Sequence, residues 1–139
     1  MADYTLPLPL ADADTLTFWE GGKAHELRAQ RCSSCKRFRW PPQGFCPHCH
    51  SWDFTWDTLR QTGRVESYVV IHQAPPAFAN QAPYAVARVV IDDTEERVIL
   101  TANVIDIEWT QVRVGMRVEV VFDDVTPEVT LPRFRAARR

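Results

Sequence analysis

The chain has 139 residues, of which 45% are hydrophobic and 24% charged, with a formal net charge of −2 at pH 7. This composition excludes collagen-like and wholly disordered proteins, and a chain of this length needs no disulfides to fold. The near-neutral charge argues against a protein that coats nucleic acid over its whole surface, although a local basic patch is compatible with it. Since the sequence contains neither a membrane-length apolar run nor a signal peptide, we expect a cytoplasmic protein without a membrane partner.

Residues 1–27 are predicted to form an extension followed by a helix. Prolines near the start disfavour helix, whereas Asp12 or Asp14 is suited to cap a helix that runs to the end of this segment. Gly21 and Gly22 each cost about 1 kcal/mol relative to alanine inside a helix, so two short helices are an alternative.

Two adjacent aromatic residues, Phe18 and Trp19, belong to the predicted helix. In a helix this small they either pack in the core or form a contact with a partner subunit.

Residues 28–54 contain the four cysteines, arranged as Cys32/Cys35 and Cys46/Cys49 with ten residues between the pairs. Each CxxC turn directs two thiolates at one point, and two such turns enclose Zn²⁺ tetrahedrally. The sequence therefore predicts a rubredoxin-like zinc ribbon. Four protein ligands leave no position for water, so the zinc is expected to be structural. A ribbon that has lost its metal, redox chemistry and an iron–sulfur centre are the alternatives.

Two histidines, His48 and His50, lie within and just after the second CxxC turn. Either could replace a thiolate in the metal shell, but four thiols already complete it, so we expect both at the surface.

The ribbon is locally basic, because residues 23–52 contain six lysines and arginines and one acidic residue. Arg37 and Arg39, close to Trp40 and Phe45, resemble a contact for a phosphorylated or nucleotide-bearing ligand. A solvated basic face without a ligand is the alternative.

Residues 55–139 are predicted to form a five-stranded OB-fold barrel with a basic C-terminal tail, because strand-like runs follow one another closely without helices between them. Pro132 in the last run predicts an edge strand. The five runs are 64–73, 84–92, 97–105, 117–123 and 129–135.

No nucleophile and base stand in a recognisable catalytic pattern in this sequence. His72 is the best isolated general base, but a single histidine in a strand is more often structural. We therefore predict no catalytic residue in this chain.

The combination of these motifs resembles the zinc-ribbon/OB-fold acyl-CoA-associated family, long described as a domain of unknown function. The similarity extends from about Thr15 to Arg135. The segments that carry it are Phe18-Trp19-Glu20-Gly21, Leu27–Cys32, Cys35, Pro41-Pro42, Cys46–Cys49, Gly63–Tyr68, Ala77-Phe78, Tyr84, Gly115–Val118 and Thr130–Arg135.

The resemblance implies a mainly β protein that is a non-catalytic partner of thiolase-like or lipid-transfer-type enzymes, including retro-aldolases that shorten steroid side chains held as CoA thioesters. It implies that this chain stabilises the partner subunit and helps to shape the CoA-thioester channel, with His72 and Phe78 at the channel mouth. Lys36 and His50 depart from the family, which often has glycine after each CxxC turn.

Two other functions are compatible with the sequence. A ribbon joined to an OB barrel is also a nucleic-acid-binding architecture, although the sequence pI near 6.1 disfavours it. A purely structural assembly module, without ligand contacts of its own, is the second alternative.

Overall fold

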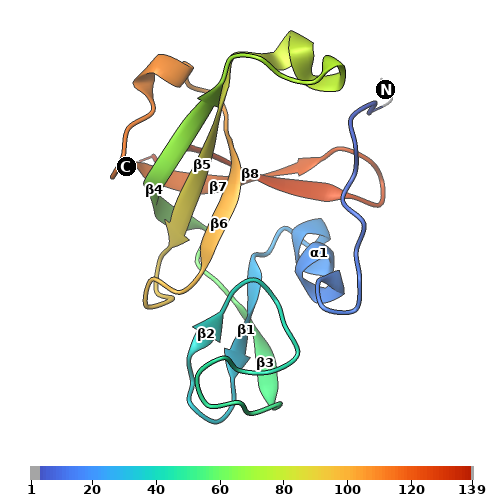
Figure 1. Ribbon diagram of the computed structural model, residues 1–139, viewed down its shortest axis with the longest axis vertical. Coiled ribbons are helices and arrows are strands. Elements are labelled where there is room, and N and C mark those ends of the chain that lie inside the picture. The colour runs from blue at the N-terminus through green and yellow to red at the C-terminus, as the bar shows by residue number, and fades with distance from the viewer. Residues whose placement is uncertain (1–3, 139) are drawn as a thin grey trace.

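The computed structural model describes residues 4–138 and contains one α-helix, two short 3-10 helices and eight strands. Figure 1 shows the zinc-ribbon segment below the barrel, with the helix beside their junction. No helix of the described residues is long and apolar enough to cross a membrane. The elements are α1 (Leu16–Lys23), β1 (Arg28–Cys32), β2 (Phe38–Arg39), β3 (Phe54–Thr58), β4 (Thr62–Ile71), η1 (Pro76–Gln81), β5 (Tyr84–Ile91), β6 (Ile99–Val104), η2 (Trp109–Gln111), β7 (Arg117–Asp124) and β8 (Thr130–Ala136).

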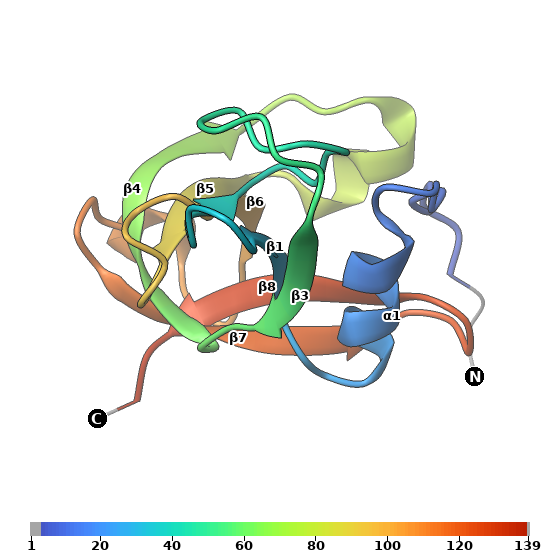
Figure 2. The same ribbon diagram turned by 90° about the horizontal axis from the view of Figure 1, so that it is seen from below.

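The ribbon is a three-stranded antiparallel sheet in the order β2-β1-β3. β1 pairs along its whole length with β3, from Arg28 opposite Thr58 to Cys32 opposite Phe54. The ribbon sheet therefore continues to Thr58, and the chain enters the barrel directly after it. Viewed from below, the ribbon strands lie in front of one end of the barrel, with α1 at one side (Figure 2).

The barrel is closed, with strand order β4-β5-β6-β8-β7 and β7 paired back to β4. All of these pairs are antiparallel except β6 with β8, which meet in parallel at Val104 and Phe134. This arrangement confirms the predicted five-stranded OB-fold barrel, because closure removes the exposed edges that an open sheet would leave.

The edge position predicted for the last strand is wrong. β8 pairs with β7 from Thr130 to Ala136 and also meets β6 at Phe134. Pro132 has no N–H to donate to a neighbouring strand. Because β8 pairs with β6 at Phe134 and not at Pro132, the missing N–H costs no hydrogen bond between these two strands.

The helix differs from its prediction in two respects, its end and its N-cap. It is one helix that ends at Lys23, and its N-cap is Thr15, with no side-chain cap bond. Asp12 accepts hydrogen bonds from the Thr15 backbone and hydroxyl instead. The helix continues through Gly21, and the missing side chain there makes room for Arg28, because a Cβ at Gly21 would lie 2.8 Å from Arg28 Cδ. His25, with φ of 60°, reverses the chain after the helix.

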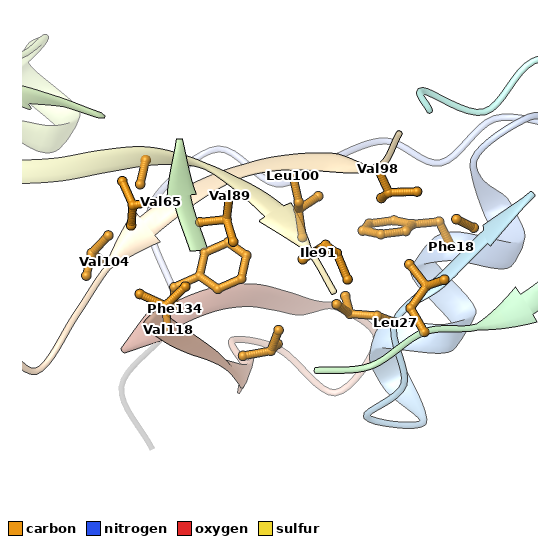
Figure 3. Close-up of a cluster of buried hydrophobic side chains, with 14 of the residues drawn as sticks. Phe18, Leu27, Val65, Val89, Ile91, Val98, Leu100, Val104, Val118 and Phe134 are labelled. Carbon is orange, nitrogen blue, oxygen red and sulfur yellow. The ribbon is translucent and has the colours of Figure 1, made fainter. Parts of the chain in front are cut away.

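One continuous hydrophobic core joins the barrel to the ribbon and the helix. Phe134 is fully buried inside the barrel, while Phe18 and Leu27 extend the same cluster toward the ribbon. Figure 3 shows these side chains in a single array, bridged by Ile91 and Leu100 of the barrel. The ribbon and the barrel are therefore held together by apolar burial.

Two arginines of the basic C-terminal run pair with carboxylates of the neighbouring strand. Arg133 donates to Asp123 at 2.8 Å and Arg135 to Glu119 at 3.2 Å across the β7–β8 pair. Two arginines of the predicted basic tail, Arg133 and Arg135, therefore belong to a barrel strand and have paired charges.

We expect Gly63→Ala to lower the free energy of unfolding by about 3 kcal/mol, because overpacking a closed backbone contact forces strands apart. A Cβ at Gly63 would overlap the Val90 carbonyl oxygen and lie 2.8 Å from Val89 Cγ1. Gly44→Ala is the control, since its Cβ would meet Trp52 at an ordinary 3.5 Å. Urea denaturation measures both variants, and equal stability of the two would contradict the packing argument.

Candidate functional site

The four cysteine sulfurs meet at the end of the ribbon sheet. All four Sγ atoms lie within 4.8 Å of one another, with Cys32 3.5 Å from Cys49 and Cys35 3.6 Å from Cys46. A tetrahedron with Zn–S bonds of about 2.3 Å has sulfurs about 3.8 Å apart. The cluster therefore fits Zn²⁺ closely.

Backbone hydrogen bonds shape each CxxC turn around its sulfurs. The Cys35 N–H lies 3.4 Å from Cys32 Sγ, and the His48 N–H lies 3.4 Å from Cys46 Sγ. Each turn closes on a residue in the left-handed region, Lys36 with φ of 66° and His50 with φ of 64°. These are the two positions where the family resemblance expected glycine, and glycine adopts this conformation without a steric penalty.

The environment prepares some of these thiols for deprotonation. The backbone N–H groups of Cys49 and His48 lower the pKa of the Cys46 thiol to about 6. The backbone N–H of Cys35 lowers the pKa of the Cys32 thiol in the same way. The Ser51 N–H lowers the pKa of Cys49, but the neighbouring sulfurs and burial together raise it to about 11. Without metal the sulfurs thus compete for negative charge, and a bound cation would remove that competition.

The fold places the two arginines predicted near a phosphate, Arg37 and Arg39, in different environments. Arg37 is exposed, whereas Arg39 is 3% exposed inside the ribbon. Arg39 Nε donates to Gln30 Oε1 at 2.8 Å, and its guanidinium carbon lies 4.4 Å from the centre of the Phe54 ring. Arg39 therefore ties together the three ribbon strands, a role that the sequence did not indicate.

The two aromatic residues of α1 have different environments. Phe18 is buried in the core, 4.9 Å from the Trp40 ring, while Trp19 is half-buried. Both line a groove of about 370 Å³ between α1, the ribbon and the barrel. Contact of Trp19 and Phe18 with a partner stays a prediction, and on this chain Trp19 offers the larger accessible surface.

The two residues predicted at a channel mouth lie in separate surroundings. His72 is exposed after β4 and packs edge-to-face against Trp109, with ring centres 5.0 Å apart. Phe78 in η1 lines a cavity of about 270 Å³ with Tyr84 and Arg133. Their contact with a CoA-thioester channel is not tested by this arrangement.

The structure also contains a polar cavity that the sequence did not indicate. Arg39, His48 and Arg97 line a space of about 240 Å³ between the ribbon and the β5–β6 loop. Arg97 Nη1 lies 2.6 Å from His48 Nε2. Burial, and then the charges of Arg97 and Arg37, lower the pKa of His48, which favours the neutral imidazole that accepts this bond. Nothing in the sequence connects Arg97 to the ribbon.

Two sequence families match directly adjoining parts of the chain. Residues 19–55 match the family described as the ChsH2 rubredoxin-like zinc ribbon domain, and residues 56–123 match the ChsH2 C-terminal OB-fold domain. Together with the cysteine geometry, these matches confirm a zinc ribbon with a structural metal.

Several curated relatives are similar to this chain. A probable enoyl-CoA hydratase alpha subunit of Thermomonospora curvata is 40% identical over 94% of this chain and 40% of its own length. A DUF35 domain-containing scaffold protein of Methanocaldococcus jannaschii is 37% identical over 66% of this chain and 64% of its own. The 3-oxo-4,17-pregnadiene-20-carboxyl-CoA hydratase alpha subunit of Mycobacterium tuberculosis is 32% identical over 84% of this chain and 36% of its own length.

A solved structure matches almost end to end. A chain of the structure described as the Ltp2-ChsH2(DUF35) aldolase is 38% identical, with a TM-score of 0.84 over 94% of this chain and 100% of that chain. In contrast, this chain spans about two fifths of the two hydratase alpha subunits.

We expect Cys46→Ser to abolish stoichiometric zinc and to lower the melting temperature, because a structural zinc site contributes its binding energy to folding. His48→Ser in the same turn is the control and should keep its zinc, since His48 is outside the four-sulfur cluster. Metal analysis and thermal unfolding measure both variants. Unchanged zinc and stability in Cys46→Ser would refute the structural metal.

Replacing Lys36 tests the left-handed turn. We expect Lys36→Gly to be about 1 kcal/mol more stable than Lys36→Ala, because a side chain in this conformation costs about 1–2 kcal/mol and the flexibility of glycine offsets only part of that. At Ser34 in the same turn φ is not positive. At this position the order should reverse, and the free energy of unfolding of Ser34→Gly should be about 0.5–1 kcal/mol below that of Ser34→Ala. Chemical denaturation of the four zinc-loaded variants gives both differences, and the same order at both positions would contradict the argument.

Proposed function

This chain belongs to the ChsH2 (DUF35) family of zinc-ribbon and OB-fold proteins, and on that basis we propose that it is a non-catalytic accessory subunit of an acyl-CoA enzyme complex. The observation that carries the proposal is the end-to-end structural match to a chain of the Ltp2-ChsH2(DUF35) aldolase. A match that covers both domains supports a shared role better than a match to either domain would, because ribbons and OB barrels each occur with many functions.

The partner that we propose is a thiolase-like or lipid-transfer-type enzyme that cleaves or forms a carbon–carbon bond on a CoA thioester. Relatives named as hydratase alpha subunits, one of them for a pregnadiene-carboxyl-CoA, support an acyl-CoA substrate and a connection with steroid side-chain degradation. The relative named as a scaffold protein supports the accessory role. The proposed complex acts in a reducing compartment such as the cytoplasm, where the cysteines stay available to the metal.

In this proposal the chain's own contribution is structural. Zinc, held by Cys32, Cys35, Cys46 and Cys49, fixes the ribbon. The ribbon and α1 then hold Trp19 and Trp40 along the 370 Å³ groove against the barrel. This groove is a largely apolar surface that a partner subunit could cover to complete a channel for an acyl chain.

Charge pairing on the barrel disfavours the nucleic-acid alternative. Cations of the barrel strands face carboxylates: Arg64 pairs with Glu96, Arg88 with Glu66 and Arg117 with Asp92. A groove that follows a phosphate backbone needs cations that are free to bind it. The described barrel surface therefore offers few of them.

Affinity purification of the tagged chain from its native cell extract tests the proposal. We expect a stoichiometric thiolase-like protein by mass spectrometry, unchanged by nuclease treatment, and acyl-CoA turnover that requires both subunits. The Cys46→Ser variant should lose the partner, whereas His48→Ser should retain it. A nuclease-sensitive set of nucleic-acid proteins without a thiolase homologue would refute the proposal.

A further inference from the structure

The protein satisfies only part of the Arg39 guanidinium. Gln30 accepts its Nε–H, and the Phe54 ring covers one face. Both terminal nitrogens, Nη1 and Nη2, are buried and have no hydrogen-bond partner among residues 4–138. Arginine stays charged inside proteins, and a buried donor without an acceptor is costly, so such a group calls for a bound water or ion.

A second arginine reaches the same place from another part of the chain. Arg97 precedes β6, and its Nη1 is engaged with His48, but its Nε is buried without a partner in the described part of the chain. Arg39 and Arg97 line one cavity of about 240 Å³. Its rim includes the exposed residues Pro47, His48 and Glu96, so the cavity reaches the surface.

The cavity carries excess positive charge. The carboxylate in its lining is Glu96, and this group is already paired with Arg64. Neither Arg39 nor Arg97 pairs with a carboxylate among residues 4–138, and three of their guanidinium nitrogens have no hydrogen-bond partner there.

We propose that this cavity between β2 and the β5–β6 loop binds a phosphate group through the guanidinium groups of Arg39 and Arg97. A phosphate monoester carries nearly two negative charges and three acceptor oxygens, and it takes paired arginine donors in a fork geometry. A carboxylate has one charge and two oxygens, so it offers the two guanidiniums less negative charge and fewer acceptor atoms. The phosphate fits the charge and the donors of both.

The surroundings favour the phosphate of an organic ligand. Trp40 lines the polar cavity and also the 370 Å³ apolar groove. A molecule with its phosphate at Arg39 therefore has an aromatic face and an apolar surface within reach. The inference stands on this chain alone and does not depend on the proposed partner.

The test follows arginine side-chain Nε–H signals by NMR in the zinc-loaded chain of 139 residues at pH 7.5 and constant ionic strength. Inorganic phosphate should shift the Arg39 and Arg97 signals in a saturating manner, whereas acetate should bind more weakly and shift both signals less. Adenosine 3′,5′-bisphosphate tests the source of the phosphate. Affinity at least tenfold above that of inorganic phosphate indicates an organic ligand, and equal affinity indicates free phosphate.

Variants locate the binding. Arg97→Lys keeps the charge but lacks the forked guanidinium donors, and it should weaken phosphate binding at least tenfold with the remaining spectrum unchanged. Arg39→Lys provides a second measurement. The control is Arg113→Lys, because exposed Arg113 donates to backbone carbonyls in a distant loop. Shifts no larger with phosphate than with acetate, or wild-type affinity in both cavity variants, would overturn the proposal. Since no partner is present, this result is independent of the purification experiment.

Discussion

Burial of one continuous apolar core is the constraint on which the other features of this protein depend. The barrel closes around Phe134, and the same core continues through Ile91 to Leu27 and Phe18. The Leu59 N–H donates to the Leu27 carbonyl at 2.7 Å, where the chain passes from ribbon to barrel. Because apolar burial fixes the ribbon against the barrel, the groove and the polar cavity between them have defined walls.

The ribbon itself has little apolar core, and polar interactions hold it instead. The four cysteines fix one end of its sheet. Farther along, Gln30 accepts hydrogen bonds from Arg39 Nε and from the Gln43 N–H, while Phe54 packs on the guanidinium. A small sheet that cannot bury enough apolar surface requires such cross-links, and a metal is a common one.

The pairing of charged side chains differs between the barrel and its junction with the ribbon. On the barrel, cations and carboxylates pair across neighbouring strands, so the surface is nearly neutralised. At the junction with the ribbon, Arg39 and Arg97 remain without carboxylate partners among residues 4–138. The paired charges of the barrel surface therefore contrast with these two cations of the cavity at its junction with the ribbon.

The sequence alone determined the zinc ribbon and the barrel, because CxxC spacing and strand periodicity are local patterns that constrain each segment independently of the others. The tertiary structure decided how residues distant in sequence meet. Phe18 is buried only because the barrel end and Trp40 cover it, and Pro132 avoids an edge only because the barrel closes. Arg97 joins Arg39 through the packing of ribbon on barrel, and no local pattern records a contact made across that interface.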